Sequence, residues 1–467
     1  MSNFFLLMQQ ELLLTAIIFI LLFMKLSTVE WKTKNVLLVV NVLLTINLAA
    51  GFFFQGKGIL FGDMFQQTDL LRLEKNILNL GTLLISLQSY NWLLKHKHAT
   101  EFYLLMLSTL LGMFFMLSSS NLLMFYVGLE LASIPLAALA NFDLEKRRSS
   151  EAAMKYIMSS AFASGLLLFG ISMMYGVTGT VSFAELQTAA SDQPLFLFSF
   201  ILVLAGFGFK ISAVPFHLWT ADVYEGSPIA VTSYLSVISK GSMIFAMTTV
   251  LFTVFQSLIF HWYNIIAVLA VLSMIVGNLF AIRQQNVKRF LAFSSISQVG
   301  FILIGVTGAN AIGQSSVIYF VLIYIFSNLA AFGVLSLVSS EKGKETIDDF
   351  KGFYKTNPLL TWVLAIALFS LAGIPPTAGF FGKFFLILAG AGKNNYPLIT
   401  IAALNMVVSL YYYLRIIKAM FMDANETPIE KVEMTWAPKL SMAICVAGIV
   451  ITGVVSAAYE YIYSLVK

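Results

Sequence analysis

Four ionisable side chains lie near the middle of long apolar segments. They are Glu130 in LLMFYVGLELASIPLAAL, Lys210 in LVLAGFGFKISAVPFHLW, Lys240 in TSYLSVISKGSMIF and Lys383 in LFSLAGIPPTAGFFGKFF. A charge at the centre of a bilayer costs about 2.5–3.5 kcal/mol on insertion scales, so such residues usually face a polar path or pair with one another. Lysine and carboxyl groups held away from bulk water can bind and release protons as their surroundings change. The set therefore predicts a path for protons.

A static role is the alternative for these residues. Glu130 paired with one lysine could serve only to lock two helices together. Three lysines cannot be neutralised pairwise by one glutamate, so the surplus lysines must be hydrated or neutral. For the whole set, proton conduction is therefore the favoured interpretation.

Two weaker candidates lie close to these segments. Lys155 follows Glu151 by four residues in EAAMK, a favourable spacing for an ion pair on one helix. This pair could be purely structural, or Lys155 could tune Glu130 electrostatically. His217, in PFHLWTADVYEGSP, could titrate at working pH or could be an interfacial anchor like Trp219.

Prolines interrupt two of the lysine-bearing segments. Pro215 lies five residues after Lys210, and Pro375 and Pro376 precede Lys383. A proline inside a helix removes a backbone hydrogen bond, and in lipid the freed carbonyl groups are tolerated only where protein or water satisfies them. Both segments are therefore predicted to be broken helices beside a hydrated cavity, whereas Pro135 is expected to cause a simple packing kink.

The composition identifies the environment of these segments. Of the 467 residues, 59% are hydrophobic and 11% are charged, with a mean hydropathy of +0.86, whereas soluble domains carry about 25% charged residues. A soluble enzyme, a nucleic-acid-binding protein and a disordered chain are excluded, and the net charge of +5 does not change this. The apolar runs are continuous, which excludes a transmembrane barrel. The N-terminus has no basic region or cleavage site, so we expect a retained first span.

An all-α polytopic membrane protein with fourteen spans is predicted, at about 20 residues a span. The spans are expected at 4–24, 35–54, 70–92, 102–119, 121–141, 153–175, 195–219, 229–255, 262–282, 290–308, 315–338, 358–390, 396–421 and 438–463. Spans 4–8 and 9–13 would form two inverted five-helix repeats, with the broken spans 7 and 12 in matching positions, a pattern typical of a transport pathway. The chain is then one membrane domain, divided into 1–100, 101–255, 262–421 and 438–467.

The basic residues predict the orientation. Of the 28 Lys and Arg residues, 18 fall in loops on one side, which indicates the cytoplasm. The opposite side has Lys57, Arg72, Lys75, Lys393 and Lys467. Both termini are therefore expected on the non-cytoplasmic side. Four charged residues near predicted span ends are expected to snorkel or to be solvated: Glu11, Glu101, Arg415 and Glu460.

Cofactor chemistry is disfavoured for this chain. Cys445 is the single cysteine, so an intrachain disulfide or an iron–sulfur cluster is excluded. The four histidines, His96, His98, His217 and His261, lack the usual spacing of a zinc site, and no phosphate-binding loop or dinucleotide fingerprint occurs. We expect no metal and no cofactor here, so any electrons must move through other subunits.

Four segments together resemble a known family. YVGLELASIPLAAL, GFGFKISAVPFHLWTADVYEGSP, NVKRFLAFSSISQVGF and SLAGIPPTAGFFGKFF closely resemble the antiporter-like membrane subunits of respiratory complex I, an NADH:quinone oxidoreductase. The resemblance covers spans 4–13 and implies fourteen helices with two inverted repeats. It also implies that Glu130, Lys210, Lys240 and Lys383 form a hydrated central axis for proton translocation, coupled to quinone reduction elsewhere in the complex.

The resemblance implies partners as well. They are other membrane subunits of complex I in a bacterial inner membrane, with NADH, quinone, FMN and iron–sulfur clusters bound by other subunits and no nucleic acid. The alternative is a subunit of a multisubunit cation/proton antiporter without a redox partner. One departure is Gln298, where many relatives carry a histidine. Glutamine can order water but cannot hold a transferable charge, so we expect water to bridge this position.

Overall fold

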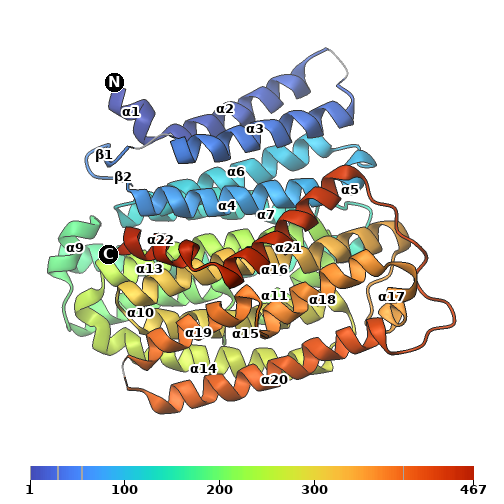
Figure 1. The fold of residues 1–467 in the computed structure, drawn as a ribbon. Helices are drawn as coiled ribbons and strands as arrows, with labels where there is room; N and C mark the ends of the chain where they lie inside the picture. The colour runs from blue at the N-terminus through green and yellow to red at the C-terminus, as the bar shows by residue number, and fades with distance from the viewer. Residues whose placement is uncertain (1, 29–30, 54–55, 393) are drawn as a thin grey trace.

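The computed structural model describes residues 2–28, 31–53, 56–392 and 394–467. Figure 1 shows a bundle of long helices that run side by side and are joined by short loops at the two ends. The N-terminal helices form one edge of the bundle, and α14 and α20 form the opposite edge (Figure 1).

The first part of the chain forms three long helices and a small hairpin. Its elements are α1 (Ser2–Leu7), α2 (Gln9–Leu26), α3 (Thr33–Phe53), β1 (Gly58–Leu60), β2 (Phe65–Gln67), α4 (Asp69–Gln88) and α5 (Tyr90–Leu94). The two strands pair antiparallel at the end of the bundle where α4 begins.

The middle of the chain contains the first broken helix. Its elements are α6 (Ala99–Leu117), α7 (Leu122–Ala140), α8 (Arg147–Thr178), α9 (Phe183–Ala189), α10 (Pro194–Ile211), α11 (Leu218–Gly226), α12 (Ile229–Ser233), the π-helix η1 (Tyr234–Ser239) and α13 (Lys240–Thr253). The helices α12, η1 and α13 follow one another without a gap as a single span, Ile229–Thr253.

The last part contains the second broken helix. Its elements are η2 (Gln256–Leu258), α14 (Ile259–Arg283), α15 (Val287–Thr307), α16 (Ala311–Lys342), η3 (Asp348–Phe350), α17 (Phe353–Thr356), α18 (Pro358–Ala372), α19 (Ala378–Ala391), α20 (Tyr396–Phe421), α21 (Trp436–Val454) and α22 (Ala457–Val466). The division of the last span into α21 and α22, and the π-helix η1, had no signal in the apolar pattern.

The prediction of an all-α polytopic membrane protein is confirmed. Among the described residues, 12 helices are long and apolar enough to cross a membrane. Two further predicted spans are helical but differ in kind. The helix α4 has a full length of 20 residues but contains acidic and basic side chains, and the predicted span 358–390 consists of the two shorter helices α18 and α19. The grouping of these helices into inverted repeats stays a prediction.

Two pairs of neighbouring helices pack closely through glycines. A Cβ atom on Gly112 or Gly128 would lie within 3 Å of backbone atoms across the α6–α7 contact. The same holds for Gly277 and Gly300 across the α14–α15 contact. Backbones can approach this closely only where a side chain is missing, as is common between membrane helices. The close contacts fix α7 and α15, which both contribute to the site described below.

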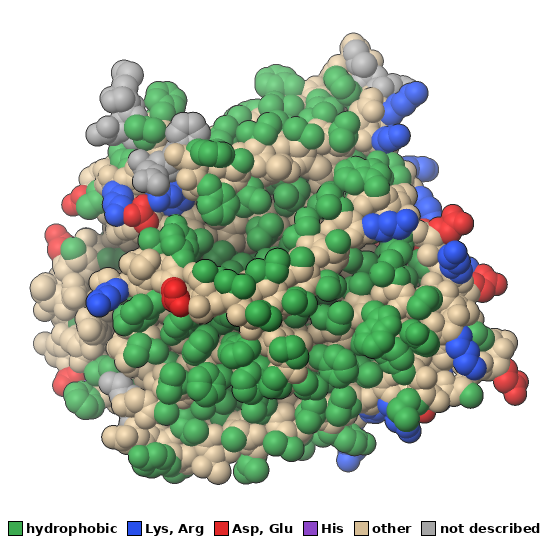
Figure 2. All heavy atoms as spheres, viewed as in Figure 1, with side chains coloured by type: hydrophobic (Ala, Val, Ile, Leu, Met, Phe, Trp, Pro, Cys, Tyr) green, Lys and Arg blue, Asp and Glu red, His purple; other side chains and the backbone are tan. Residues whose placement is uncertain are grey.

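The surface has the polarity of a membrane protein. Figure 2 shows a broad hydrophobic face, with charged side chains gathered at the ends of the bundle and most of the visible Lys and Arg at one end. Exposed apolar side chains cover the outer helices, for example Phe162 on α8, Phe260 on α14 and Val407 on α20. Such a band faces lipid or other membrane subunits.

The predictions for Glu11 and Lys75 are wrong. Both side chains are buried, and Lys75 Nζ lies 2.5 Å from Glu11 Oε1. The reason is that α4 lies inside the bundle, between the α2–α3 layer and α16 (Figure 1), with the hairpin next to its first turns. Arg415 is not simply solvated either, because its guanidinium donates to the Ile282 and Gln284 carbonyl oxygens at the end of α14, each at 2.6 Å.

Candidate functional site

The first predicted break is present between α10 and α11. Ser212 adopts a left-handed conformation, with φ 63°, directly after α10. The backbone groups freed by the break find side-chain partners: the Val214 N–H donates to Ser273 Oγ at 2.9 Å, and Trp219 Nε1 donates to the Phe209 carbonyl at 3.3 Å. The break is therefore satisfied by protein, as a non-helical segment in a membrane must be.

Lys210 lies at the end of α10 and is 8% exposed. Its ammonium donates to Ser133 Oγ on α7 at 2.6 Å and to Ser160 Oγ on α8 at 2.8 Å. Glu130 lies one turn before Ser133 on α7, and its Oε1 is buried without a hydrogen-bond partner among the described residues. Within that part of the chain, no ion pair joins Lys210 directly to Glu130. A buried acceptor without a protein partner indicates water.

Lys240 is the first residue after the π-helix η1 and is 2% exposed. Its Nζ donates to Ser295 Oγ on α15 at 2.8 Å and lies 5.2 Å from the centre of the Tyr224 ring. π-Helical turns inside α-helices frequently mark functional sites, because they shift the direction of the side chains that follow. Here the turn precedes a lysine that contacts a hydroxyl and an aromatic ring and has no carboxylate partner in the described structure.

The second predicted break is present between α18 and α19, and Lys383 satisfies it. Gly373 closes α18 with φ 85°, and α19 starts at Ala378. Lys383 Nζ donates to the carbonyl oxygens of Leu371 at 2.8 Å and Ala372 at 3.3 Å, and it lies 4.7 Å from the centre of the Phe301 ring. The carbonyl groups freed by the break therefore bind the lysine itself, which is 1% exposed.

Gln298 links the last two lysines. Its Nε2 donates to the Leu371 carbonyl at 3.0 Å and to the Tyr413 hydroxyl at 3.0 Å, so Gln298 and Lys383 share one acceptor. On the other side of Gln298 lies a cavity of about 10 Å³ that is also lined by Lys240 and Ser295. This volume is close to the smallest that holds one water molecule. Gln298 thus lies between Lys240 and Lys383, next to space for a single water.

The structure does not place Lys155 with these residues. Lys155 Nζ lies 2.7 Å from Asp222 Oδ2 and 2.8 Å from Glu151 Oε1, so the predicted helical pair with Glu151 is present. Asp222 also binds Arg289 Nη1 at 2.7 Å, so this network ties α8, α11 and α15 together. His217 lies inside the first break, at the start of α11, and its Nδ1 is buried with no partner among the described residues.

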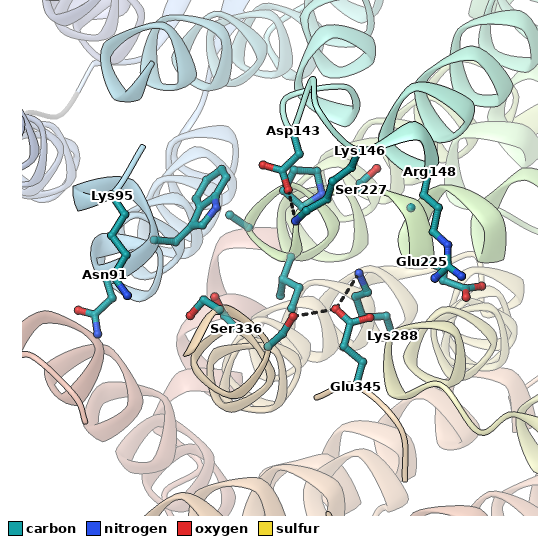
Figure 3. A pocket seen from close by; sticks show the side chains of 17 residues that line it. Asn91, Lys95, Asp143, Lys146, Arg148, Glu225, Ser227, Lys288, Ser336 and Glu345 are labelled. Carbon is teal, nitrogen blue, oxygen red and sulfur yellow. Dashed lines mark hydrogen bonds and ion pairs between the residues drawn. The ribbon is translucent and has the colours of Figure 1, made fainter. Parts of the chain in front are cut away.

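A cavity of about 340 Å³ opens at the basic end of the bundle (Figure 3). Charged side chains of both signs line it, among them Asp143, Lys146, Arg148, Glu225, Lys288 and Glu345. Lys288 is 7% exposed and is not an ordinary loop charge, since its Nζ lies 3.2 Å from Glu345 Oε1. Burial alone would raise the pKa of Glu345, but the Lys288 charge and the Ser339 hydroxyl hold that pKa below its usual range.

Two buried hydroxyls, those of Ser227 and Tyr224, belong to the segment that joins this cavity to the neighbourhood of Lys240. Ser227 lines the cavity, and its Oγ is buried without a partner among the described residues. The Tyr224 hydroxyl lies near the Ser236 and Ser295 hydroxyls, and its ring contacts Lys240. An unsatisfied buried hydroxyl such as that of Ser227 indicates ordered water. Polar side chains therefore occur both at the cavity, with Ser227, and beside Lys240, with Tyr224.

The hydroxyl partners of the lysines were missed from the sequence. These partners are Ser133, Ser160 and Ser295, which lie in apolar runs where a hydroxyl is unremarkable. The available signal was helical spacing, since Ser133 lies three residues after Glu130 and so on the same face of α7. Among the described residues, no group of three or more His, Cys, Asp or Glu side chains could hold a metal ion.

The sequence and the fold match proteins of known families. Residues 119–409 match the family model described as NADH:quinone oxidoreductase/Mrp antiporter, TM. NADH-quinone oxidoreductase subunit N of Azobacteroides pseudotrichonymphae is 46% identical, over 99% of this chain and 98% of the relative. The subunit N protein of Phocaeicola vulgatus is 44% identical, over 97% of both chains.

Solved structures agree with the sequence relatives. A chain of respiratory complex I from Thermus thermophilus with bound aureothin has a TM-score of 0.83 at 29% identity, covering 96% of this chain and 97% of that one. A chain of the Mrp complex from Dietzia sp. has a TM-score of 0.88 at 21% identity, over 98% and 96% of the two chains, which shows a shared fold.

These matches define an integral membrane protein of the antiporter-like class. The chain belongs to the NADH:quinone oxidoreductase/Mrp antiporter family of membrane subunits, and the curated relatives that it matches over nearly their whole length are subunit N proteins.

Proposed function

We propose that this chain is a proton-translocating, non-redox membrane subunit of an NADH:quinone oxidoreductase. Electron transfer from NADH to quinone, and the FMN and iron–sulfur clusters that it requires, belong to partner subunits. The residues that carry the protons are Glu130, Lys210, Lys240 and Lys383. The setting is a bacterial inner membrane, with both termini on the non-cytoplasmic side.

One observation carries this proposal: each of the three buried lysines is bound by neutral acceptors. Lys210 and Lys240 donate to serine hydroxyls and Lys383 donates to backbone carbonyls. A carboxylate in direct contact would hold an ammonium permanently charged, whereas a hydroxyl or carbonyl can bind either an ammonium or an amine. Each site therefore tolerates both protonation states, as a proton relay requires.

The route of a proton follows from these contacts. Water in the cavity at the basic end supplies a proton through Ser227 and Tyr224 to Lys240, whose amine becomes an ammonium. Lys240 then returns to the amine as the proton crosses the one-water cavity beside Gln298, and Lys383 becomes the ammonium. Gln298 orders the water but does not take up the proton.

The remaining residues act around this route. Glu130 provides the negative charge near Lys210, and the two serines bind that ammonium without neutralising it. His217, whose Nδ1 has no partner among the described residues, is a secondary proton-carrying candidate in the first break. Lys155 is a positioning residue, because its ion pairs fix α11 against α8.

The test is Lys210→Ala in the assembled complex, with proton pumping measured in membrane vesicles during NADH oxidation. We expect an assembled complex with sharply reduced pumping and coupled activity. The control is Lys97→Ala, which removes a lysine exposed in a loop. Normal pumping by an assembled Lys210→Ala complex would contradict the proposal.

The second candidate function is a cation/proton antiporter subunit without a redox partner. The observation that favours it is the fold shared with the Mrp complex chain. Absorbance of the native complex separates the two. Flavin and iron–sulfur absorbance should accompany this chain if it belongs to an NADH:quinone oxidoreductase, and their absence from an intact native complex would favour the antiporter.

A further inference from the structure

A second group of buried charges lies outside the line of lysines, in the first three long helices. We call it the N-terminal cluster, and none of its side chains is more than 3% exposed. Its members are Gln10 and Glu11 on α2, Gln67 on β2, and Glu74, Lys75 and Asn76 on α4. In Figure 1, α4 lies between the α2–α3 layer and the helices α13 and α16.

Part of the cluster is fully paired. Lys75 Nζ lies 2.5 Å from Glu11 Oε1 and donates to Gln67 Oε1 at 2.7 Å. Gln10 Nε2 donates to Asn76 Oδ1 at 2.7 Å. Both amides pack against Gly51 of α3, where a Cβ atom would lie 2.0 Å from Asn76 Oδ1. The Glu11–Lys75 pair alone is a closed ion pair that neutralises itself.

Glu74 is the charge left over. Its Oε2 is buried and has no hydrogen-bond partner among the described residues, and the same is true of Glu11 Oε2 and Gln10 Oε1. Arg72 lies two residues earlier on α4 but is held by Asp69 at the beginning of that helix. Isolating a carboxylate from water is very costly, so a buried acid of this kind is protonated or contacts internal water.

Glu74 lies on the face of α4 that packs against the span of Lys240. Helical spacing places Glu74 on the same face of α4 as Leu78 and Gly81. That face packs on the span of Lys240: a Cβ atom on Gly81 would lie 2.3 Å from Ile238, and one on Gly241 would lie 3.7 Å from Leu78. Glu74 is one turn, about 5.4 Å, from Leu78 toward the hairpin end of the bundle.

We propose that Glu74 is a further proton-carrying residue, which releases protons from the level of Lys240 toward the non-cytoplasmic surface. This rests on the proposed function above. This is a second branch at Lys240: an ammonium that does not pass its proton to Lys383 gives it up through internal water and becomes an amine, while the Glu74 carboxylate becomes a carboxylic acid. Glu74 then returns the proton to water that passes the Glu11–Lys75 pair and leaves near Asp69. The Glu11–Lys75 pair keeps this passage polar and, because its two charges neutralise each other, does not hold the proton there.

The experiment compares Glu74→Gln with Glu74→Asp in the assembled complex. Glutamine keeps the size and hydrogen bonding of the side chain but cannot exchange a proton, whereas aspartate keeps the acid and shortens the chain. We expect Glu74→Gln to lower proton pumping in vesicles several-fold at unchanged electron transfer to an artificial acceptor, and Glu74→Asp to restore most of it. The matched control is Glu460→Gln, at an exposed acid on α22.

The two variants separate a proton carrier from a structural residue, since a purely structural role predicts that Gln is tolerated better than Asp. Normal pumping with Gln, better pumping with Gln than with Asp, or loss of assembly with Gln would overturn the inference. Lys210→Ala, measured in parallel, keeps the two proposals apart. If that variant stops pumping while Glu74→Gln pumps normally, only the role of Glu74 fails. If Lys210→Ala pumps normally, the proposed function fails.

Discussion

The two broken helices each hold a buried lysine near the break, but they bind it with different groups. In both, a left-handed residue ends the first half-helix, Ser212 in one case and Gly373 in the other, and a buried lysine lies near the break. Lys210 is bound by hydroxyls from two neighbouring helices, with Glu130 close by. Lys383 is bound by the carbonyl groups of its own broken span.

The difference shows how far the structure of each break depends on its lysine. Around Lys210, Ser133 already donates its hydroxyl to the Leu129 carbonyl at 2.6 Å, so this hydroxyl keeps a partner when the lysine is absent. The Ala372 carbonyl, by contrast, loses the donor that Lys383 supplies. The first break is therefore independent of its lysine, whereas the second break and Lys383 depend on each other.

The largest expected effect comes from replacing each lysine by methionine. Both Lys383→Met and Lys210→Met should abolish proton pumping. Lys383→Met should also lower the thermal stability of the complex, because the Ala372 carbonyl loses the lysine donor while Leu371 keeps Gln298, and a buried acceptor without a donor costs about 1–3 kcal/mol. Lys210→Met should leave thermal stability nearly unchanged. Equal losses of stability in the two variants would contradict the contrast between the breaks.

A smaller effect is expected at the residues that end the half-helices. Gly373 has φ 85°, and an added Cβ atom would lie 3.2 Å from Lys383 Cδ, so Gly373→Ala should destabilise the protein by about 1–2 kcal/mol. Ser212 already adopts φ 63° with a side chain, and its Oγ is buried without a partner in the described part of the chain. Ser212→Ala should therefore be nearly neutral in a thermal melt. A Ser212→Ala variant as unstable as Gly373→Ala would show that the breaks are alike.

The smallest effect lies far from both breaks, at the cavity of the basic end. The pKa of Glu345 is held below its ordinary value of 4.5, so its ion pair with Lys288 stabilises the fold above that pH. The contribution is lost as pH falls through the lowered pKa, because the carboxylate is then protonated in the folded state as well. Glu345→Gln should cost about 1 kcal/mol at neutral pH, since the pair is partly exposed. Thermal melts against pH should show the difference from the natural protein vanishing in acid.

The sequence predicted the features that have a local cause. A lysine inside an apolar run and a proline inside a helix are visible in a short window, so Lys210, Lys240, Lys383 and both breaks could be located. Their hydroxyl partners could not, because a serine in a membrane helix can always bond its own preceding turn, as Ser133 does with the Leu129 carbonyl.

The N-terminal cluster shows a different limit. Glu11 and Lys75 are 64 residues apart and lie near the ends of predicted spans, where a charge is normally solvated. Only the packing of α4 inside the bundle buries them. Long-range burial of this kind has no signal in a single sequence.

The carbonyl oxygen of Leu371 couples the hydrogen bond of Gln298 to the protonation state of Lys383. It accepts hydrogen bonds from Gln298 at 3.0 Å and from Lys383 at 2.8 Å, so one oxygen atom is the acceptor for both donors. A charged ammonium polarises that oxygen more strongly than an amine does, which changes the bond that the glutamine makes. The one-water cavity beside Gln298 therefore adjoins an amide whose bond to Leu371 depends on whether Lys383 is an ammonium or an amine.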